Sequence, residues 1–263
     1  MGTFLSNTAK LLTPDSLAKA MIRRLSCFLA MPIIIILTAS SAQAEGLTEF
    51  RMKLKAERFR PISVTMSGTQ SLVKLPNENW QFQLMADGSW AGIEETSEFS
   101  VQQNQVLPVH FQSDSHFSFF SEKKEITFDR QNNKISITVD KDQRTLDLKA
   151  AVFDPHSYQI HLANQIREGK SDIEFQVIRY KRPLIYSYQV VGEEWLNTAT
   201  GKLLTVKVRQ VRGVDKKEDY FVWLAKDYGY IPIQFEHYKK DKIIDRIEMI
   251  SGTFDGKPIQ GSR

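Results

Sequence analysis

The stretch from Leu184 to Ile250 decides the fold class of this chain. It contains the runs LIYSYQVVGEEWL (184–196), LLTVKVRQV (203–211), DYFVWLAKDYGYIPIQFEHY (219–238) and IIDRIEMI (243–250). Apolar residues alternate with polar ones in each run, which is the pattern of a strand with one face buried. Turn-forming pairs such as Thr200-Gly201 and Lys240-Asp241 separate the runs. The stretch therefore predicts a series of antiparallel strands.

The same alternation extends towards the N-terminus. It predicts further strands at 47–59, 62–75, 80–86, 93–101, 106–112, 125–139 and 144–148. Asp87-Gly88 and Asn104 are suited to the turns between them. The segment 125–139 reads as a hairpin that turns at Asn132-Asn133, where we expect both asparagines to adopt positive φ.

One helix is predicted at about 155–168. Asp154 can accept hydrogen bonds from the first free amides, and Pro155 suits the first helical position. Tyr158, Leu162 and Ile166 recur at helical spacing, and Gly169 is suited to the C-terminal end. We expect this short amphipathic helix to lie on the sheet or to fill an open end of it.

The strands and the helix predict a mainly β fold. Many short alternating strands need their sheet edges covered, so we expect a single antiparallel sheet that is strongly curved or closed into a β-barrel. No repeat or linker interrupts the pattern, so residues 45–254 are interpreted as a single β domain. The segment 255–263 contains two glycines and a proline and is expected to be a flexible tail.

The first 44 residues are interpreted as a segment that the mature protein lacks. Residues 21–44 have the order of a signal peptide: Arg23-Arg24, an apolar core at 25–37, and Ala42-Gln43-Ala44 at the end. The core has about 13 residues, fewer than the ~20 that cross a bilayer. We expect cleavage after Ala44, no transmembrane anchor, and a periplasmic location in a Gram-negative bacterium. Residues 1–20 fit no part of this leader and are interpreted as a non-native N-terminal extension, with Met21 as the start.

Charge and cysteine content narrow the class of partner. The chain has 35 basic and 31 acidic residues, of which the first 44 positions hold four and one, leaving 31 and 30. A nearly neutral exported protein is not expected to bind nucleic acid. The one cysteine, Cys27, lies in the leader, so the predicted mature chain has neither a disulfide nor a thiolate metal ligand.

Residues with catalytic chemistry do not form a recognisable set. The histidines are His110, His116, His156, His161 and His237, and they lack the spacing of a zinc site. The sequence has no Gly-x-Ser-x-Gly, and Glu193-Glu194 are adjacent on a strand and should face opposite sides. The carboxylates of Asp215, Glu218 and Asp219 fall on a charged hairpin loop. We therefore predict no catalytic residues, no metal, no cofactor and no enzymatic activity.

Several of these segments follow one another in a recognisable order. Val190 to Glu194, a Thr-Gly turn, a Thr-Val-Lys-Val strand at 205–208, Trp223 to Asp227 and Tyr230 to Ile233 resemble the exported bacterial family known as domain of unknown function 3108 (DUF3108). The helix after Asp154 and the hairpin FDRQNNKI (128–135) are also similar to that family. The resemblance is strongest from 172 to 250; Glu57 to Pro61 replace the glycines expected there. It implies a secreted or outer-envelope β protein and brings no activity.

Two functions from different classes remain as hypotheses. The first is a non-enzymatic module that binds a hydrophobic small molecule, a lipid or an envelope protein, with these candidate residues: Phe117, Phe119, Phe120, Tyr186, Tyr188 and His237. Core strand positions are the alternative for the phenylalanines, and a strand-end position is the alternative for His237. The second is a secreted hydrolase of cell-wall polymer whose carboxylates converge from distant strands, with at least one raised pKa. A scaffold that binds partners through a strand edge is a third possibility.

Overall fold

The computed structural model describes residues 46–59, 63–88, 91–118, 120–148, 151–211 and 218–262. The expected extension (1–20) and signal peptide (21–44) therefore lie outside the described residues. Within these residues, no helix is both long and apolar enough to span a bilayer.

The N-terminal half is a meander in which each strand pairs with the next. Its strands are β1 (Phe50–Arg58), β2 (Val64–Lys74), β3 (Trp80–Asp87), β4 (Ala91–Gln102), β5 (Gln105–Phe117), β6 (Phe120–Asp129), β7 (Lys134–Val139) and β8 (Asp142–Asp147). Gln103 and Asn104 turn the chain from β4 to β5 with φ of 49° and 64°. Between β6 and β7 only Asn133 has positive φ, so the expectation for Asn132 is wrong. Its amide instead donates to the carboxylate of Asp129.

The C-terminal half is a second meander, entered through the helix. Its elements are β9 (Val152–Phe153), α1 (Ser157–Arg167), β10 (Asp172–Arg179), β11 (Arg182–Thr198), β12 (Gly201–Val211), β13 (Glu218–Ala225), the 3₁₀ turn η1 (Lys226–Tyr228), β14 (Ile231–Lys239), β15 (Lys242–Phe254) and β16 (Lys257–Pro258). A bulge lies between Val190 and Gly192, where β11 pairs with β12.

All the strands belong to one sheet, ordered β8-β7-β6-β5-β4-β3-β2-β1-β15-β14-β13-β12-β11-β10-β9, with β16 beside β15. The first and last long strands, β1 and β15, pair in the middle and join the two meanders. The mainly β, single-sheet prediction is confirmed. The sheet is not closed into a barrel, because its path ends at β8 and β9 and no pairing between described residues joins these two edges.

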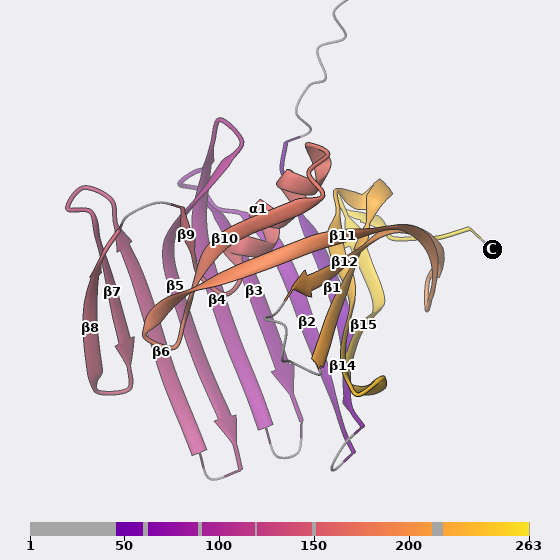
Figure 1. Ribbon diagram of the computed structural model, residues 1–263, viewed down its shortest axis with the longest axis horizontal. Coiled ribbons are helices and arrows are strands. Elements are labelled where there is room, and N and C mark those ends of the chain that lie inside the picture. The colour runs from indigo at the N-terminus through magenta and orange to yellow at the C-terminus, as the bar shows by residue number, and fades with distance from the viewer. Residues whose placement is uncertain are drawn as a thin grey trace, which may run out of the picture. The chain divides into compact units, whose positions relative to one another are not determined.

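The core lies between the two halves of the sheet. One cluster of buried side chains joins strands of both halves to the inward side of α1, for example Phe82, Leu162 and Leu224. In Figure 1, β10 and β11 cross in front of β4, β5 and β6. A second cluster, in which Ile178 of β10 packs with Phe111 and Ile126, holds this crossing together. The enclosed face of the sheet is therefore covered by the sheet itself and by α1.

The helix ends close to where the sequence predicts but begins later, because its N-cap residue is His156 and Pro155 precedes it. The Asp154 carboxylate accepts hydrogen bonds from the amides of His156 and Ser157 at 2.8 and 3.0 Å, and the Ser157 hydroxyl accepts one from the Asp154 amide. This reciprocal pattern resembles a capping box placed just before the helix, whose N-cap residue, His156, makes no side-chain capping bond. Gly169, with φ of 84°, ends the helix, and its amide donates to Ile166. The helix spans Ser157–Arg167, slightly shorter than predicted, and packs against β4, β5, β10 and β14.

The expected flexible tail is packed onto the sheet. Ile259 is 1% exposed in the core, and Ser262 exchanges backbone hydrogen bonds with Lys202. Close approach explains this, because a Cβ atom on Gly252 would lie 3.0 Å from Ile259 and one on Gly261 would lie 2.5 Å from the backbone of Gly201. Glycines that suggest disorder in the sequence here permit tight packing of the C-terminal segment.

Candidate ligand-binding site

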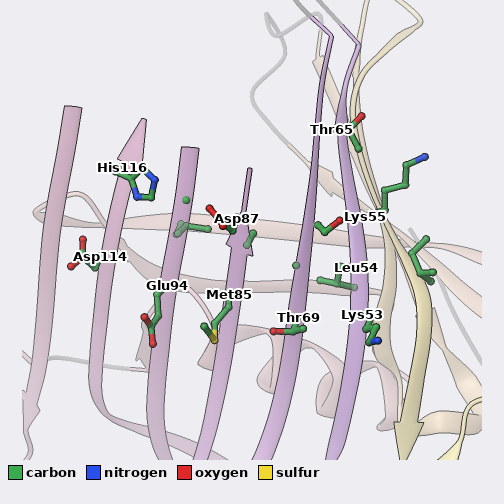
Figure 2. A pocket seen from close by; sticks show the side chains of 16 residues that line it. Lys53, Leu54, Lys55, Thr65, Thr69, Met85, Asp87, Glu94, Asp114 and His116 are labelled. Atoms are coloured by element: carbon green, nitrogen blue, oxygen red, sulfur yellow. The ribbon is translucent and has the colours of Figure 1, made fainter. Parts of the chain in front are cut away.

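The outward face of the N-terminal meander carries a shallow groove of about 970 Å³ (Figure 2). Lys53, Thr69, Met85, Glu94 and Asp114 lie in register across five neighbouring strands along it. Their side chains are exposed, on the opposite side of the sheet from the core. Asp114 forms an ion pair with Lys123 at 3.0 Å, as expected for a solvated, mixed-charge face. The groove is open to solvent, so a ligand lying in it would stay exposed on one side.

The inner face encloses a different, largely apolar cavity. It has a volume of about 220 Å³ and lies between β1–β3 of one half, β13–β15 of the other, and α1. Its apolar walls are formed by Leu54, Phe82, Leu84, Leu162, Tyr188, Val222, Leu224, Ile233, Phe235 and Ile247. Alternation places the strand residues there, because each strand turns one set of side chains towards the core, and Leu162 reaches the cavity from α1. We call this space the inner cavity.

One polar group in the inner cavity has no partner. The side-chain amide nitrogen of Gln70 is buried and makes no hydrogen bond to any residue that the structure describes. Gln70 is only 8% exposed and lines the inner cavity. An unsatisfied buried donor costs about 1–3 kcal/mol. The amide can therefore hydrogen-bond an acceptor that enters the cavity.

A satisfied polar cluster lies beside the cavity. The His156 imidazole Nε2 is 2.8 Å from Glu95 Oε2, and the Ser113 hydroxyl donates to Glu95 Oε1 at 3.0 Å. The His156 ring is 4% exposed and stacks on Phe82 with 4.6 Å between centroids. Burial alone would raise the pKa of Glu95, but hydrogen bonds from His156 and Ser113 and attraction to His156 and Lys124 lower it below its ordinary value. Glu95 is thus held as a carboxylate.

A wider opening, of about 740 Å³, lies between β4–β8 and the hairpin of β10 and β11. We call it the basic opening, because five cationic side chains line it against the two carboxylates of Glu95 and Glu122. These are Lys124, Arg144, Arg179, Lys181 and Arg182. Three of them come from the Arg179–Arg182 turn, which the sequence shows as a short basic run.

Lys124 is the most enclosed of these cations. It alternates with Ile126 and Phe128 on β6, so it faces inward. Its ammonium lies 5.7 Å from the centroid of the Phe111 ring. Burial lowers the pKa of Lys124, although Glu95 and Glu122 act in the opposite direction. Among the described residues, no carboxylate forms an ion pair with it.

An aromatic wall connects the basic opening to the inner cavity. Tyr158 lines both spaces, Tyr186 lines the opening and Tyr188 lines the cavity. The Tyr158 ring lies 5.6 Å from that of Tyr186 and 6.2 Å from that of Tyr188. A molecule with an apolar part and a charged part could therefore contact the inner cavity, the aromatic wall and the basic opening at the same time.

The structure places the six candidate ligand-binding residues from the sequence in different surroundings. Tyr186 and Tyr188 lie at the site, as just described. Phe120 is 79% exposed at the tip of the β5–β6 hairpin, so the core interpretation is wrong for it. It shares the strand face of Glu122 and Lys124. Phe119 and the side chain of Phe117 lie outside what the structure describes.

His237 lines neither the inner cavity nor the basic opening. Its Nδ1 atom lies 2.9 Å from Asp245 Oδ2, and its ring stacks on Tyr220 at 4.2 Å. The Glu218 carboxylate is 3.7 Å from Nε2. These contacts match the strand-end interpretation of this histidine, although its buried Nε2 atom makes no hydrogen bond to any described residue.

The carboxylates that the sequence suggested for a hydrolase do not converge. Glu193 pairs with Lys226 at 2.6 Å, while Glu194 accepts from the indole of Trp223. Asp215 lies outside the described residues. Where a pKa shift is resolved for a described carboxyl group, the shift is downward. The described residues contain no group of three potential metal ligands.

Sequence reasoning missed Glu95, Ser113, Lys124 and Gln70. Each occupies an inward position on a strand where the alternation would place an apolar residue. That interruption of the pattern was the available signal. It does not by itself reveal that distant residues such as His156 complete the cluster.

Solved structures align with this chain at low sequence identity. A β-barrel-like protein of domain of unknown function DUF1849 from Brucella abortus aligns with a TM-score of 0.55 at 10% identity, over 79% of this chain and 98% of that one. This similarity concerns the fold alone. The MucA/MucB complex of Pseudomonas aeruginosa aligns with a TM-score of only 0.35 at 11% identity, over 81% of this chain and 53% of that one.

Family comparison gives a firmer result. A search of curated proteins finds no match to this chain. The model of the family described as "Protein of unknown function (DUF3108)" matches residues 49–241, which include every strand of both meanders except β15 and β16. This confirms the resemblance seen in the sequence. The chain therefore belongs to the DUF3108 family.

Proposed function

We propose that this protein is a non-enzymatic binding module of the bacterial envelope that holds the apolar part of a lipid-like ligand. The observation that carries the proposal is the inner cavity, an apolar space of about 220 Å³ between the halves of the sheet. Apolar pockets with a few placed polar groups are the usual form of small-molecule sites. The Gln70 amide is such a group.

The size of the cavity limits what it can hold. Pockets for whole drug-sized ligands measure about 300–1,000 Å³. A space of about 220 Å³ suits part of a ligand, such as a segment of an acyl chain, with the remainder outside. The chain could belong to a free lipid or to a lipidated envelope protein.

Export to the periplasm is part of this proposal. It is supported by the signal-peptide pattern of residues 21–44. N-terminal sequencing of the protein recovered from the periplasm should begin at Glu45. An uncleaved chain in the cytoplasmic fraction would contradict export.

Binding can be tested with N-phenyl-1-naphthylamine, an uncharged probe that fluoresces in apolar surroundings. Its fluorescence should rise on addition of the purified protein. Val222→Phe would fill the inner cavity, because Val222 lines it and is only partly buried. We expect this variant to bind the probe about tenfold more weakly, a loss of about 1.4 kcal/mol.

Val64→Phe is the matched control, because Val64 is 37% exposed and lines neither the cavity nor the opening. It should bind the probe as the unmodified protein does. No fluorescence change with the unmodified protein, or equal binding by both variants, would contradict the proposed function.

A further inference from the structure

The basic opening has a charge that its own side chains do not balance. Lys181 pairs with Asp142. Lys124, Arg144 and Arg182, in contrast, form no ion pair with any residue that the structure describes. Arg179 donates to the Tyr186 hydroxyl at 3.2 Å and lies over the Tyr180 ring. The two carboxylates of the lining leave an excess of positive charge, because Glu95 is already engaged by His156 and Ser113.

Retaining Lys124 in this position costs free energy. Its ammonium faces inward beside Phe111 and loses part of its hydration. A methionine or leucine there would continue the alternation of β6 at no such cost. A charge kept half-buried without an ion-pair partner is typical of a site whose partner is a ligand.

The geometry of the opening suits one kind of anion. Arginine side chains present planar forks of N–H donors that match phosphate oxygens, and a lysine supplies a compact charge beside them. Arg179 and Arg182 are direct partners at the end of the β10–β11 ladder, so they reach the opening together. Lys124 approaches from the opposite wall, on β6.

We propose that the basic opening binds the phosphate headgroup of an amphiphile whose hydrocarbon chain lies along the aromatic wall into the inner cavity. This inference rests on the proposed function, because it adds a headgroup to the apolar ligand inferred above. The shared contact with Tyr158 gives the chain a route from the opening to the cavity.

The test measures displacement of N-phenyl-1-naphthylamine by three competitors: dodecyl phosphate below its critical micelle concentration, dodecanol below its solubility limit, and inorganic phosphate. Dodecyl phosphate should displace the probe at a concentration at least about tenfold lower than dodecanol, a ratio that falls as salt screens the charges. Inorganic phosphate alone should not displace it, because the probe and the phosphate occupy different spaces.

Variants locate the effect. We expect the double variant Arg179→Gln/Arg182→Gln, at two exposed positions, to bind dodecyl phosphate about tenfold more weakly and dodecanol with unchanged affinity. We expect the same of the single variant Lys124→Met. The control double variant Lys240→Gln/Lys242→Gln removes two exposed charges from the β14–β15 turn, away from the opening. It should change the affinity for neither dodecyl phosphate nor dodecanol. Thermal unfolding of each variant checks that it is folded. If Lys124→Met does not fold, the double variant of the two exposed arginines still tests the proposal.

The outcomes separate the two proposals. The phosphate site would be overturned, and the proposed function left standing, by either of two results. One is equal displacement by dodecyl phosphate and dodecanol; the other is a loss of affinity for dodecyl phosphate in the control variant as large as in the variants of the opening. If inorganic phosphate displaced the probe as strongly as dodecyl phosphate does, the proposal that the ligand is an amphiphile would be overturned. Failure of the protein to bind the probe at all would refute the proposed function itself.

Discussion

Glu95 joins three parts of the protein through one carboxylate. It projects from β4, accepts from Ser113 on β5 and meets His156 just before α1. Glu95 and His156 are 61 positions apart, so alternation or spacing could not reveal their pairing. Tyr186 and Tyr188 could be found from sequence, because aromatic residues at inward strand positions are visible in the pattern. The buried polar residues could not, because their partners are set by tertiary packing.

We predict that Glu95→Gln removes a pH-dependent part of the stability. The pKa of Glu95 is lowered in the folded protein, so its contribution is present above the ordinary value of about 4.5 and is lost as pH falls below it. The free energy of unfolding of the variant should be about 1–3 kcal/mol lower at pH 7 than that of the unmodified protein. Between pH 6 and pH 3 it should fall less than that of the unmodified protein. Urea unfolding at several pH values measures both.

Glu94→Gln is the control for this change, because Glu94 is exposed on the outward face of the same strand. It should alter the free energy of unfolding by less than about 0.5 kcal/mol. An identical pH dependence in Glu95→Gln and the unmodified protein would contradict the role given to Glu95.

At the scale of elements, α1 is the one that sequence defined best. The Asp154 carboxylate and Gly169 act near the two ends of α1 as predicted, whereas Pro155 precedes the helix, which begins at Ser157. The strands were also recognisable, because alternation is local. Their ends and the order in which they pair were not, since β1 meets β15 through residues about 200 positions apart, such as Phe50 and Phe254.

We predict that Asp154→Ala destabilises the protein by about 2 kcal/mol. Asp154 is fully buried and accepts from two amides and from the Ser157 hydroxyl, which would all lose their acceptor. Asp154→Asn keeps one acceptor oxygen and should lose less. Denaturant unfolding followed by circular dichroism compares the two, and equal losses would argue against the capping role.

At the scale of the whole described domain, the C-terminal segment packs back onto the sheet. The C-terminal segment covers the β1–β15 junction through Ile259 and reaches β12 through Ser262. Sequence suggested a flexible tail, because its glycines and proline outnumber its apolar residues. The single isoleucine of this segment is nevertheless buried, and Gly252 leaves room for it.

We predict that Ile259→Ala lowers the free energy of unfolding by about 2–4 kcal/mol, as for other large-to-small changes in a core. Ile250→Ala serves as the control, because Ile250 is 39% exposed on β15, and it should cost less than about 1 kcal/mol. Equal, small effects of the two substitutions would show that the segment after Asp255 contributes nothing to the fold.

Native mass spectrometry of the protein purified from the periplasm without detergent tests the central claim most directly. The claim is that the space between the two halves of the sheet holds the chain of a lipid-like molecule. We predict a folded species heavier than the polypeptide, with an adduct that is released on denaturation and is absent from Val222→Phe. A mass equal to that of the bare polypeptide in the unmodified protein, or an adduct retained equally by Val222→Phe, would contradict the claim.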